Sequence, residues 1–370
     1  MAFFIALLLC IIARMEKLST TELAKQWSDI FKPGFGWVLY RFPGSNSINF
    51  AGGNIAELSF NNESVTGFLI APFFRSEQKF WCIENKLQCE LSDSEFSKLA
   101  PSLDFSYQDH PTSSSSTKEG YEALVERVLE YIALGKMQKA VPARMKQIDL
   151  KPGFSPLNLF RSLSEAYPNA FVYLLSTPQT GTWIGSTPET LARIKNNKLS
   201  TLSLAGTRKS GTTNPFTSKE NEEQAIVTGY IYDILQRYCT DIELDGPRTI
   251  SAGNIFHLAT YFNGILRSEY QSAHLRIIKE LHPTPAVCGM PLHPAREFLL
   301  QHENFDRSFY SGFLGPVSPS AADLFVNLRC MQVFPHTALL YAGAGVVPGS
   351  VPEKEWLETE EKMNTLQRFL

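Results

Sequence analysis

The stretch AFVYLLSTPQTGTWIGSTPETLARIKNNKLSTLSLA, residues 170–205, decides the fold class. Two apolar runs, at 170–176 and 182–186, lie on either side of a turn that contains Pro and Gly, and this arrangement predicts a β-hairpin. A third run, at 198–205, predicts another strand. This part of the chain is therefore expected to form consecutive strands.

Similar patterns recur on both sides of this stretch. We expect further strands at 36–40, 66–70, 139–144, 260–266, 311–317, 324–334 and 339–344. Pro142 limits the strand at 139–144 to an edge or an irregular stretch. Apolar spacing predicts helices at 121–134, 220–238 and 353–369, the second with Ile226, Tyr230, Ile234 and Tyr238 on one stripe. Runs of strands with interspersed helices, without regular βαβ alternation, favour the α+β class.

Composition and charge narrow the class of protein. The 370 residues are 44% hydrophobic, which is enough for a large buried core. Lys plus Arg number 34 and Asp plus Glu 37, so a net charge of −3 gives no global positive field for nucleic acid or an anionic membrane. The six cysteines form no CxxC pair, which indicates reduced structural thiols and a cytoplasmic location.

Two segments stand apart by composition. The apolar run from Ala2 to Ala13 is too short to span a bilayer and has no positively charged segment before it, so a signal peptide fits poorly. We expect residues 1–14 to be an unstructured apolar extension or the product of a wrongly assigned start, with Met15 as the true start; a weak membrane anchor is the alternative. The Ser/Thr-rich tract predicts a linker or surface loop at 112–120.

Motif searches exclude several kinds of chemistry. The chain has no GxxxxGK[ST], no nucleophile elbow and no HExxH, and the GAG at 343–345 is not a dinucleotide fingerprint. Locally, that GAG indicates a tight turn or a close backbone approach. Glu189, His257 and Arg329 set ionisable groups against apolar sequence. Each alone has a structural explanation: a carboxylate at a helix N-terminus, a core histidine and a buried ion-pair partner, respectively.

Glutamates cluster on two predicted helices, at 219–224 and 353–362. Such clusters are usually solvated helix faces. The functional alternative is a site for a hard cation, since Mg2+ prefers one or two carboxylates together with substrate oxygens. Glu355 and Glu358 are spaced i,i+3 and therefore share one face.

Nine ordered motifs together carry a family resemblance. They are KAVPAR at 139–144, STPETL at 186–191, LAGTRKSG at 204–211, KENEEQAIV at 219–227, IFHLAT at 255–260, LHPTPAVCG at 281–289, FYSGFLG at 309–315, NLRC at 327–330 and AGAGVVPGSVPEKEWLETEEK at 342–362. In these motifs the chain resembles the chorismate-utilising enzymes, which include isochorismate, anthranilate, aminodeoxychorismate and salicylate synthases. The resemblance implies an α+β fold of two antiparallel sheet layers with helices packed outside. It makes 15–111 a variable N-terminal part of the same fold and 121–370 the chorismate-binding catalytic region.

Two positions distinguish among the branches of the family. Aminating members carry a Gln where this chain has Lys139, and aminodeoxychorismate synthases often carry a Lys where it has Ala205. The resemblance therefore implies water addition, without a glutamine amidotransferase subunit. The implied activity is that of an isomerase that converts chorismate to isochorismate with Mg2+, for menaquinone or siderophore biosynthesis. The alternatives are a salicylate synthase, which goes on to eliminate pyruvate, and a non-catalytic chorismate-binding paralogue.

The family resemblance also assigns roles to residues. Lys139 would deprotonate the water that attacks C2, and Glu189 would protonate the departing C4 hydroxyl, which requires a neutral Lys and a protonated Glu. Glu223 and Glu358, with Glu355 nearby, would hold Mg2+ at the ring carboxylate.

Further residues are expected to bind the substrate. The enolpyruvyl carboxylate would be held by Arg329 and the backbone around Gly343 and Gly345, with Tyr310 and Lys362 beside it. His257 would lie against the ring, and the pocket floor would be formed by Thr260 or by Ala205, Gly206 and Thr207.

Overall fold

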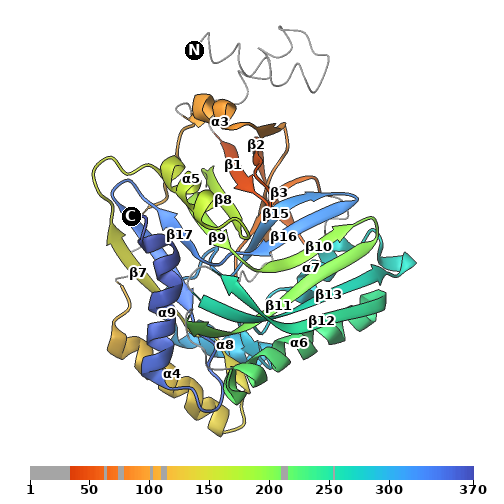
Figure 1. The fold of residues 1–370 in the computed structure, drawn as a ribbon, viewed down its shortest axis with the longest axis vertical. Helices are drawn as coiled ribbons and strands as arrows, with labels where there is room; N and C mark the ends of the chain where they lie inside the picture. Colours follow the sequence, from red (N-terminus) through yellow and green to blue (C-terminus); the bar gives the residue numbers. More distant parts are fainter. Residues whose placement is uncertain are drawn as a thin grey trace.

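The computed structural model describes residues 34–61, 65–73, 79–100, 103–109, 115–209, 216–252 and 255–370. These residues form one large, curved antiparallel sheet with helices around it, which confirms the α+β prediction (Figure 1). The helices are α3 (Asp93–Leu99), α4 (Lys118–Ala133), α5 (Pro156–Ala166), α6 (Ser218–Tyr238), α7 (His274–Leu281), α8 (Leu292–His302) and α9 (Pro352–Gln367).

The sheet of the described residues has sixteen strands and two layers. The first layer follows the order β1 (Phe35–Arg41), β8 (Phe171–Thr177), β9 (Gly181–Thr187), β17 (Cys330–Val333), β18 (Thr337–Gly343) and β7 (Ala143–Asp149). The second follows β12 (Cys239–Ala252), β13 (Ile255–Leu266), β11 (Lys198–Lys209), β10 (Thr190–Lys195), β16 (Ala321–Val326), β15 (Phe313–Ser318), β3 (Gly67–Ala71) and β4 (Lys79–Ile83). The long strand β2 (Ile48–Ser59) pairs with both β1 and β4 and so joins the layers, and β5 (Leu87–Leu91) pairs with β2.

An aromatic core lies between the two layers. Phe171 of β8 stacks on Phe325 of β16 with ring centroids 4.0 Å apart, and Trp183 of β9 stacks on Tyr341 of β18. The outer face of the first layer packs on α5 and α9, and that of the second packs on α4, α6, α7 and α8. Both faces of β8 and β9 are covered, and every residue of these two strands is buried, whereas most of β12 is exposed.

The predicted hairpin at 170–176 and 182–186 is present as β8 and β9, which pair antiparallel. Two other predicted strands are each split in two. The segment at 139–144 forms β6 (Lys139–Ala140) and β7, with a break at Val141 and Pro142; β6 pairs instead with the short strand β14 (Gly289–Met290). The segment at 324–334 forms the end of β16 and β17.

The break between β16 and β17 has an identifiable cause. The Asn327 side chain accepts a hydrogen bond from the Tyr173 hydroxyl (2.6 Å) and donates one to the carbonyl of Phe309 (2.8 Å). Arg329 then adopts a positive φ of 47°, which turns the chain out of the sheet. The expectation that Arg329 lies within a continuous apolar strand was therefore wrong.

Helix α6 begins with a local cap, in which the backbone N–H of Thr217 donates to the Glu220 carboxylate at 2.7 Å. Its buried face differs from the predicted stripe, because Ile226 and Tyr230 are only partly buried. The residues that face the core are Glu223, Gln224, Val227, Ile231, Ile234, Leu235 and Tyr238. The first two are polar and lie at the end of the helix nearest the cavity described below.

Several sequence-based expectations concern the N-terminal third. Residues 1–14 lie outside the described residues. Within the predicted linker at 112–120, the Ser116 N–H donates to the carbonyl of Met145, and residues 118–120 already belong to α4.

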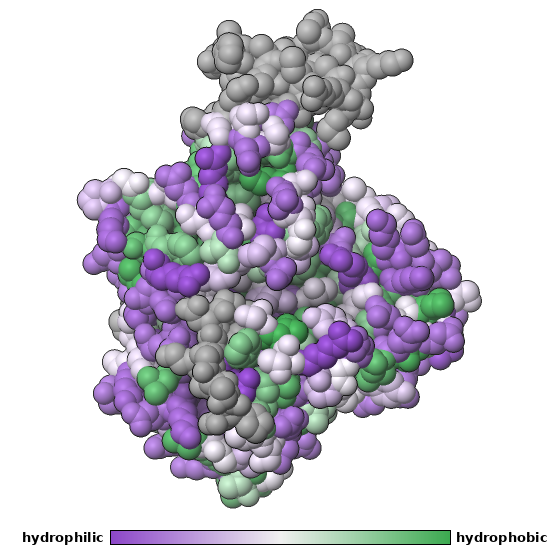
Figure 2. Space-filling view, in the orientation of Figure 1, coloured by the Kyte–Doolittle hydropathy of each residue, from purple (hydrophilic) through white to green (hydrophobic). Residues whose placement is uncertain are grey.

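In the described part of the chain, no helix is long and apolar enough to cross a membrane, and the five cysteines there are free and buried. Figure 2 shows a largely hydrophilic face on which apolar residues are scattered.

Candidate functional site

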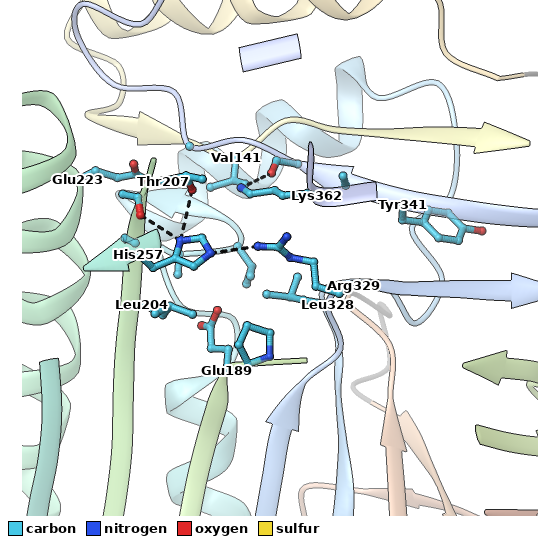
Figure 3. Close-up of a pocket in the computed structure, with 18 of the residues that line it drawn as sticks. Val141, Glu189, Leu204, Thr207, Glu223, His257, Leu328, Arg329, Tyr341 and Lys362 are labelled. Atoms are coloured by element: carbon cyan, nitrogen blue, oxygen red, sulfur yellow. Dashed lines mark hydrogen bonds between the residues drawn. The ribbon is translucent and has the colours of Figure 1, made fainter. Parts of the chain in front are cut away.

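A cavity lies where the ends of several strands meet α6 and α9 (Figure 3). Much of the predicted site lines it: Glu189, Ala205, Gly206, Thr207, Glu223, His257, Tyr310, Arg329, Gly343, Gly345 and Lys362. In Figure 3 the His257 ring lies between the Glu189 and Glu223 carboxylates, and the Arg329 guanidinium points toward it. Sequence segments from 189 to 362 thus converge on one cavity.

Lys139 lies beside this cavity, behind Glu223, and is fully buried. Its Nζ lies 3.1 Å from Oε1 of Glu223, which is an ion-pair distance, but the amine is aligned with no acceptor well enough for a hydrogen bond. Gly345 makes this arrangement possible, because a Cβ at that position would lie 2.0 Å from the same Glu223 oxygen. The structure therefore places a buried amine beside the cavity, behind Glu223, and among the described residues it has no hydrogen-bond partner.

Glu189 follows β9 and is held in a turn, where its backbone N–H donates to the Thr187 hydroxyl (3.3 Å) and its carbonyl accepts from the Val326 N–H (3.0 Å). The side chain is buried, with 3% of the residue exposed. Burial raises the pKa of Glu189 from 4.5 to about 8, despite the opposing charges of Lys139, Lys362 and Arg329. At neutral pH this carboxyl is therefore mostly protonated and can donate a proton, as the predicted acid requires.

His257 has a defined protonation state. Its Nδ1 lies 3.0 Å from the Gly206 carbonyl, and its Nε2 accepts a hydrogen bond from the Arg329 guanidinium at 3.1 Å. Nδ1 must then carry the proton, and burial, together with the charges of Arg329 and Lys362, lowers the pKa of His257 to about 3. Gly206 presents its carbonyl from a β-bulge at φ +67°, a conformation that glycine adopts without strain. The histidine is therefore a neutral ring that orients Arg329.

Arg329 is a buried cation. Burial lowers its pKa to about 10, so it remains charged at neutral pH. Its guanidinium also lies 3.5 Å from the Thr365 hydroxyl. Within the described part of the chain, no carboxylate lies within 4.0 Å of its guanidinium. A charged guanidinium at a cavity wall is suited to bind the carboxylate of a ligand.

The GAG segment at 343–345 also lines the cavity; it is the end of β18 and the chain that follows, so the expected tight turn was wrong and the close backbone approach is confirmed. Lys362 donates to the Gly343 carbonyl (2.8 Å) and pairs with Glu358 (2.7 Å), so it supports this segment from α9. A Cβ at Gly343 would lie 3.2 Å from the Tyr310 hydroxyl. Burial raises the pKa of Tyr310 to about 12, and its hydroxyl therefore stays protonated.

Thr260 does not line the cavity. Its hydroxyl accepts a hydrogen bond from Nε2 of Gln224 at 3.2 Å, which places it between β13 and α6. Of the two expected floors, the one that contacts the cavity is thus formed by Ala205, Gly206 and Thr207.

The carboxylates assigned to Mg2+ lie on α6 and α9, and each is already paired with a lysine. Glu355 is buried, and burial, together with the charge of Glu358, raises the pKa of Glu355 to about 7. Within the described residues, no three His, Cys, Asp or Glu side chains form a ready-made metal cluster. The donor set nevertheless fits Mg2+ in kind, because these are hard oxygen ligands and a divalent cation would relieve the repulsion between Glu355 and Glu358.

Other residues of the cavity wall were not singled out from the sequence: Val141, Pro188, Leu204, Ala286, Val287, Leu328, Tyr341 and Ala342. All are apolar except Tyr341, and apolar residues inside predicted strands cannot be told from core residues. Lys219 was also missed as an individual residue, although it begins the KENEEQ motif. It pairs with Glu355.

Comparison with known proteins identifies the family. Residues 62–370 match the family described as chorismate binding enzyme. The chloroplastic isochorismate synthase of Catharanthus roseus is 33% identical over 267 residues, which are 68% of this chain and 46% of that protein. The vibriobactin-specific isochorismate synthase of Vibrio cholerae is 30% identical, over 68% of this chain and 67% of that protein. The chain thus spans about half the length of the plant relative and two-thirds of the bacterial one.

A solved structure agrees over nearly the whole chain. The putative 2,3-dihydroxybenzoate-specific isochorismate synthase from Bacillus anthracis superposes with a TM-score of 0.75 and 25% identity, covering 93% of this chain and 98% of that one. Together with the family match, this establishes the class: the chain belongs to the chorismate-binding enzyme family.

Proposed function

We propose that this protein is a Mg2+-dependent isomerase that converts chorismate to isochorismate in the cytoplasm, for menaquinone or siderophore biosynthesis. The observation that carries the proposal is the pair of buried groups: a carboxyl, Glu189, that lines the cavity and retains its proton at neutral pH, and an amine, Lys139, that lies beside the cavity behind Glu223. The reaction needs one group to take a proton from water and another to give one to a leaving hydroxyl.

In the proposed reaction, Lys139 takes a proton from a water whose oxygen forms the new bond to C2 of the ring. The double bonds shift, the C4–O bond breaks, and Glu189 gives its proton to the departing hydroxyl, which leaves as water. One water is thus consumed and one released, so the product is an isomer of the substrate. The lysine at 139, in place of the Gln of aminating relatives, supports water rather than ammonia as the nucleophile.

Binding of the substrate uses the remaining polar groups. Arg329, held by the neutral His257, and the backbone N–H groups around Gly343 and Gly345 would bind the enolpyruvyl carboxylate. Glu223 and Glu358, with Glu355 beside them, would hold Mg2+, which when bound supplies positive charge that offsets the ring carboxylate.

Product analysis tests the proposal. The purified full chain is incubated with chorismate and MgCl2, with and without ammonium, and the products are separated by chromatography. Isochorismate alone, unchanged by ammonium, is the expected result. Salicylate with pyruvate would assign the elimination that follows in salicylate synthases. Anthranilate or aminodeoxychorismate would overturn the role of Lys139, and absence of any product with chorismate still bound would favour a non-catalytic paralogue.

A further inference from the structure

Each of the three carboxylates at the proposed metal site is matched by one lysine. The pairs are Glu223 with Lys139 at 3.1 Å, Glu355 with Lys219 at 2.5 Å, and Glu358 with Lys362 at 2.7 Å. The protein thus places a lysine side chain against each carboxylate of this acidic cluster. An unpaired carboxylate at this depth would be costly, since Glu355 is 1% exposed.

The three lysines differ in what else they do. Lys139 is the proposed base, and Lys362 also donates to the Gly343 carbonyl of the cavity wall. Lys219 does not line the cavity, and the hydrogen bond recorded for its ammonium goes to Oε1 of Glu355. Its contact joins the first turn of α6 to α9 across 136 residues of sequence. Charge compensation of Glu355 is therefore the role that its contacts support.

The position of Lys219 also allows its ammonium group to move away from Glu355. Its side chain is 23% exposed, whereas that of Lys139 is fully buried. A lysine ammonium sits on a flexible four-carbon chain and is well hydrated, so it can turn to solvent at little cost. Lys139 and Lys362 lack this freedom, because one is enclosed and the other is held at two points.

We propose that Lys219 is an internal counter-cation that neutralises Glu355 in the metal-free protein and is displaced when Mg2+ binds, so that it sets the metal affinity of the site. This inference rests on the proposed Mg2+ site. Two cations in contact with the same carboxylate repel each other. The net free energy of Mg2+ binding is therefore less favourable by the free energy of the Lys219–Glu355 ion pair that the metal must break.

The opposite role makes the opposite prediction. If Lys219 stays in place and only positions Glu355, its removal leaves Glu355 disordered and weakens Mg2+ binding. If it competes with Mg2+, its removal strengthens binding of the metal and destabilises the metal-free protein. The sign of the change in Mg2+ affinity therefore distinguishes a competitor from a scaffold.

The test is calorimetric titration of the full chain with MgCl2, without chorismate, combined with thermal unfolding with and without the metal. Lys219→Met is expected to bind Mg2+ about tenfold more tightly than the wild type. Without metal, this variant should unfold at a lower temperature than the wild type. Adding MgCl2 should raise its unfolding temperature by more than it raises that of the wild type. Lys219→Arg keeps the charge and should not gain affinity. Lys354→Met, at an exposed lysine on α9, is the matched control and should behave as the wild type.

Each outcome decides the inference. Unchanged or weaker Mg2+ binding by Lys219→Met overturns it, as does absence of binding by both proteins. If Lys219→Met fails to fold without metal, refolding of this variant at increasing MgCl2 replaces the titration. Recovery of the fold on adding MgCl2 supports the inference, and no recovery at any concentration overturns it. A wild type that binds Mg2+ but forms no isochorismate refutes the proposed function alone, because the titrations contain no substrate.

Discussion

Replacing Glu189 by Gln tests two properties of this carboxyl separately: its role as a proton donor in turnover, and the free energy of unfolding that its burial costs. In the unfolded chain Glu189 ionises near pH 4.5, whereas in the folded protein it keeps its proton until about pH 8. Between these values the folded state binds more protons than the unfolded state, so stability is greatest below pH 4.5 and falls as pH rises to 8. The full effect is about 5 kcal/mol, of which about 3 kcal/mol is lost by pH 7.

Gln has the size of a protonated Glu but cannot ionise in either state. Glu189→Gln is therefore expected to be up to about 3 kcal/mol more stable than the wild type at pH 7, with the difference vanishing near pH 4. The same variant should lose kcat by about 10²–10⁴-fold, since it cannot protonate the leaving hydroxyl. In the ligand-free wild type, the acid form is depleted above pH 8, and kcat/KM should fall there about tenfold per pH unit.

Urea unfolding at several pH values between 4.5 and 8 measures the stability difference, and chorismate turnover followed by chromatography measures kcat. Glu165→Gln is the matched control, because it removes an exposed carboxyl on α5 instead of a buried one. It should change neither the stability nor kcat. A Glu189→Gln variant that keeps the pH dependence of wild-type stability would refute the assignment of a buried, protonated carboxyl. Normal turnover would refute its role as the acid.

Three further substitutions test the other groups. Lys139→Ala should abolish turnover while calorimetry still detects Mg2+-dependent chorismate binding; near-normal kcat would remove it as the base. Arg329→Gln should raise KM for chorismate by about 100-fold, the value of one charged hydrogen bond, and an unchanged KM would move the carboxylate site elsewhere. Gly345→Ala, whose Cβ would lie 2.0 Å from Glu223, should lose activity in the turnover assay, whereas Gly229→Ala, with open space around it, should not.

The elements of the fold could be predicted from the sequence where apolar spacing is regular. The hairpin at 170–186 is an example, since its turn and both its strands are local features. The breaks at Pro142 and Arg329 were harder to predict. Proline within a predicted strand signals an irregular stretch, but the turn at Arg329 depends on hydrogen bonds that Asn327 makes to Tyr173, 154 residues away. Long-range partners of this kind leave no periodic pattern in the sequence.

The site shows the same division. The family motifs point to chemical groups one by one, and most of those groups line one cavity. The motifs do not give the protonation state of each group in the folded protein. Glu189 retains its proton because strands distant in sequence bury it, and His257 is neutral because the fold buries it beside the charges of Arg329 and Lys362. Protonation is thus a property of the assembled site, not of a motif.

The pairing of lysines with glutamates extends this argument to the metal. The i,i+3 spacing places Glu355 and Glu358 on one face of α9, but the two carboxylates repel each other when buried together. Lys219 and Lys362 lie against these two carboxylates and offset their repulsion. At the proposed Mg2+ site, such pairing would lower the affinity for the metal in exchange for stability without it. The titration of Lys219→Met measures this loss of affinity.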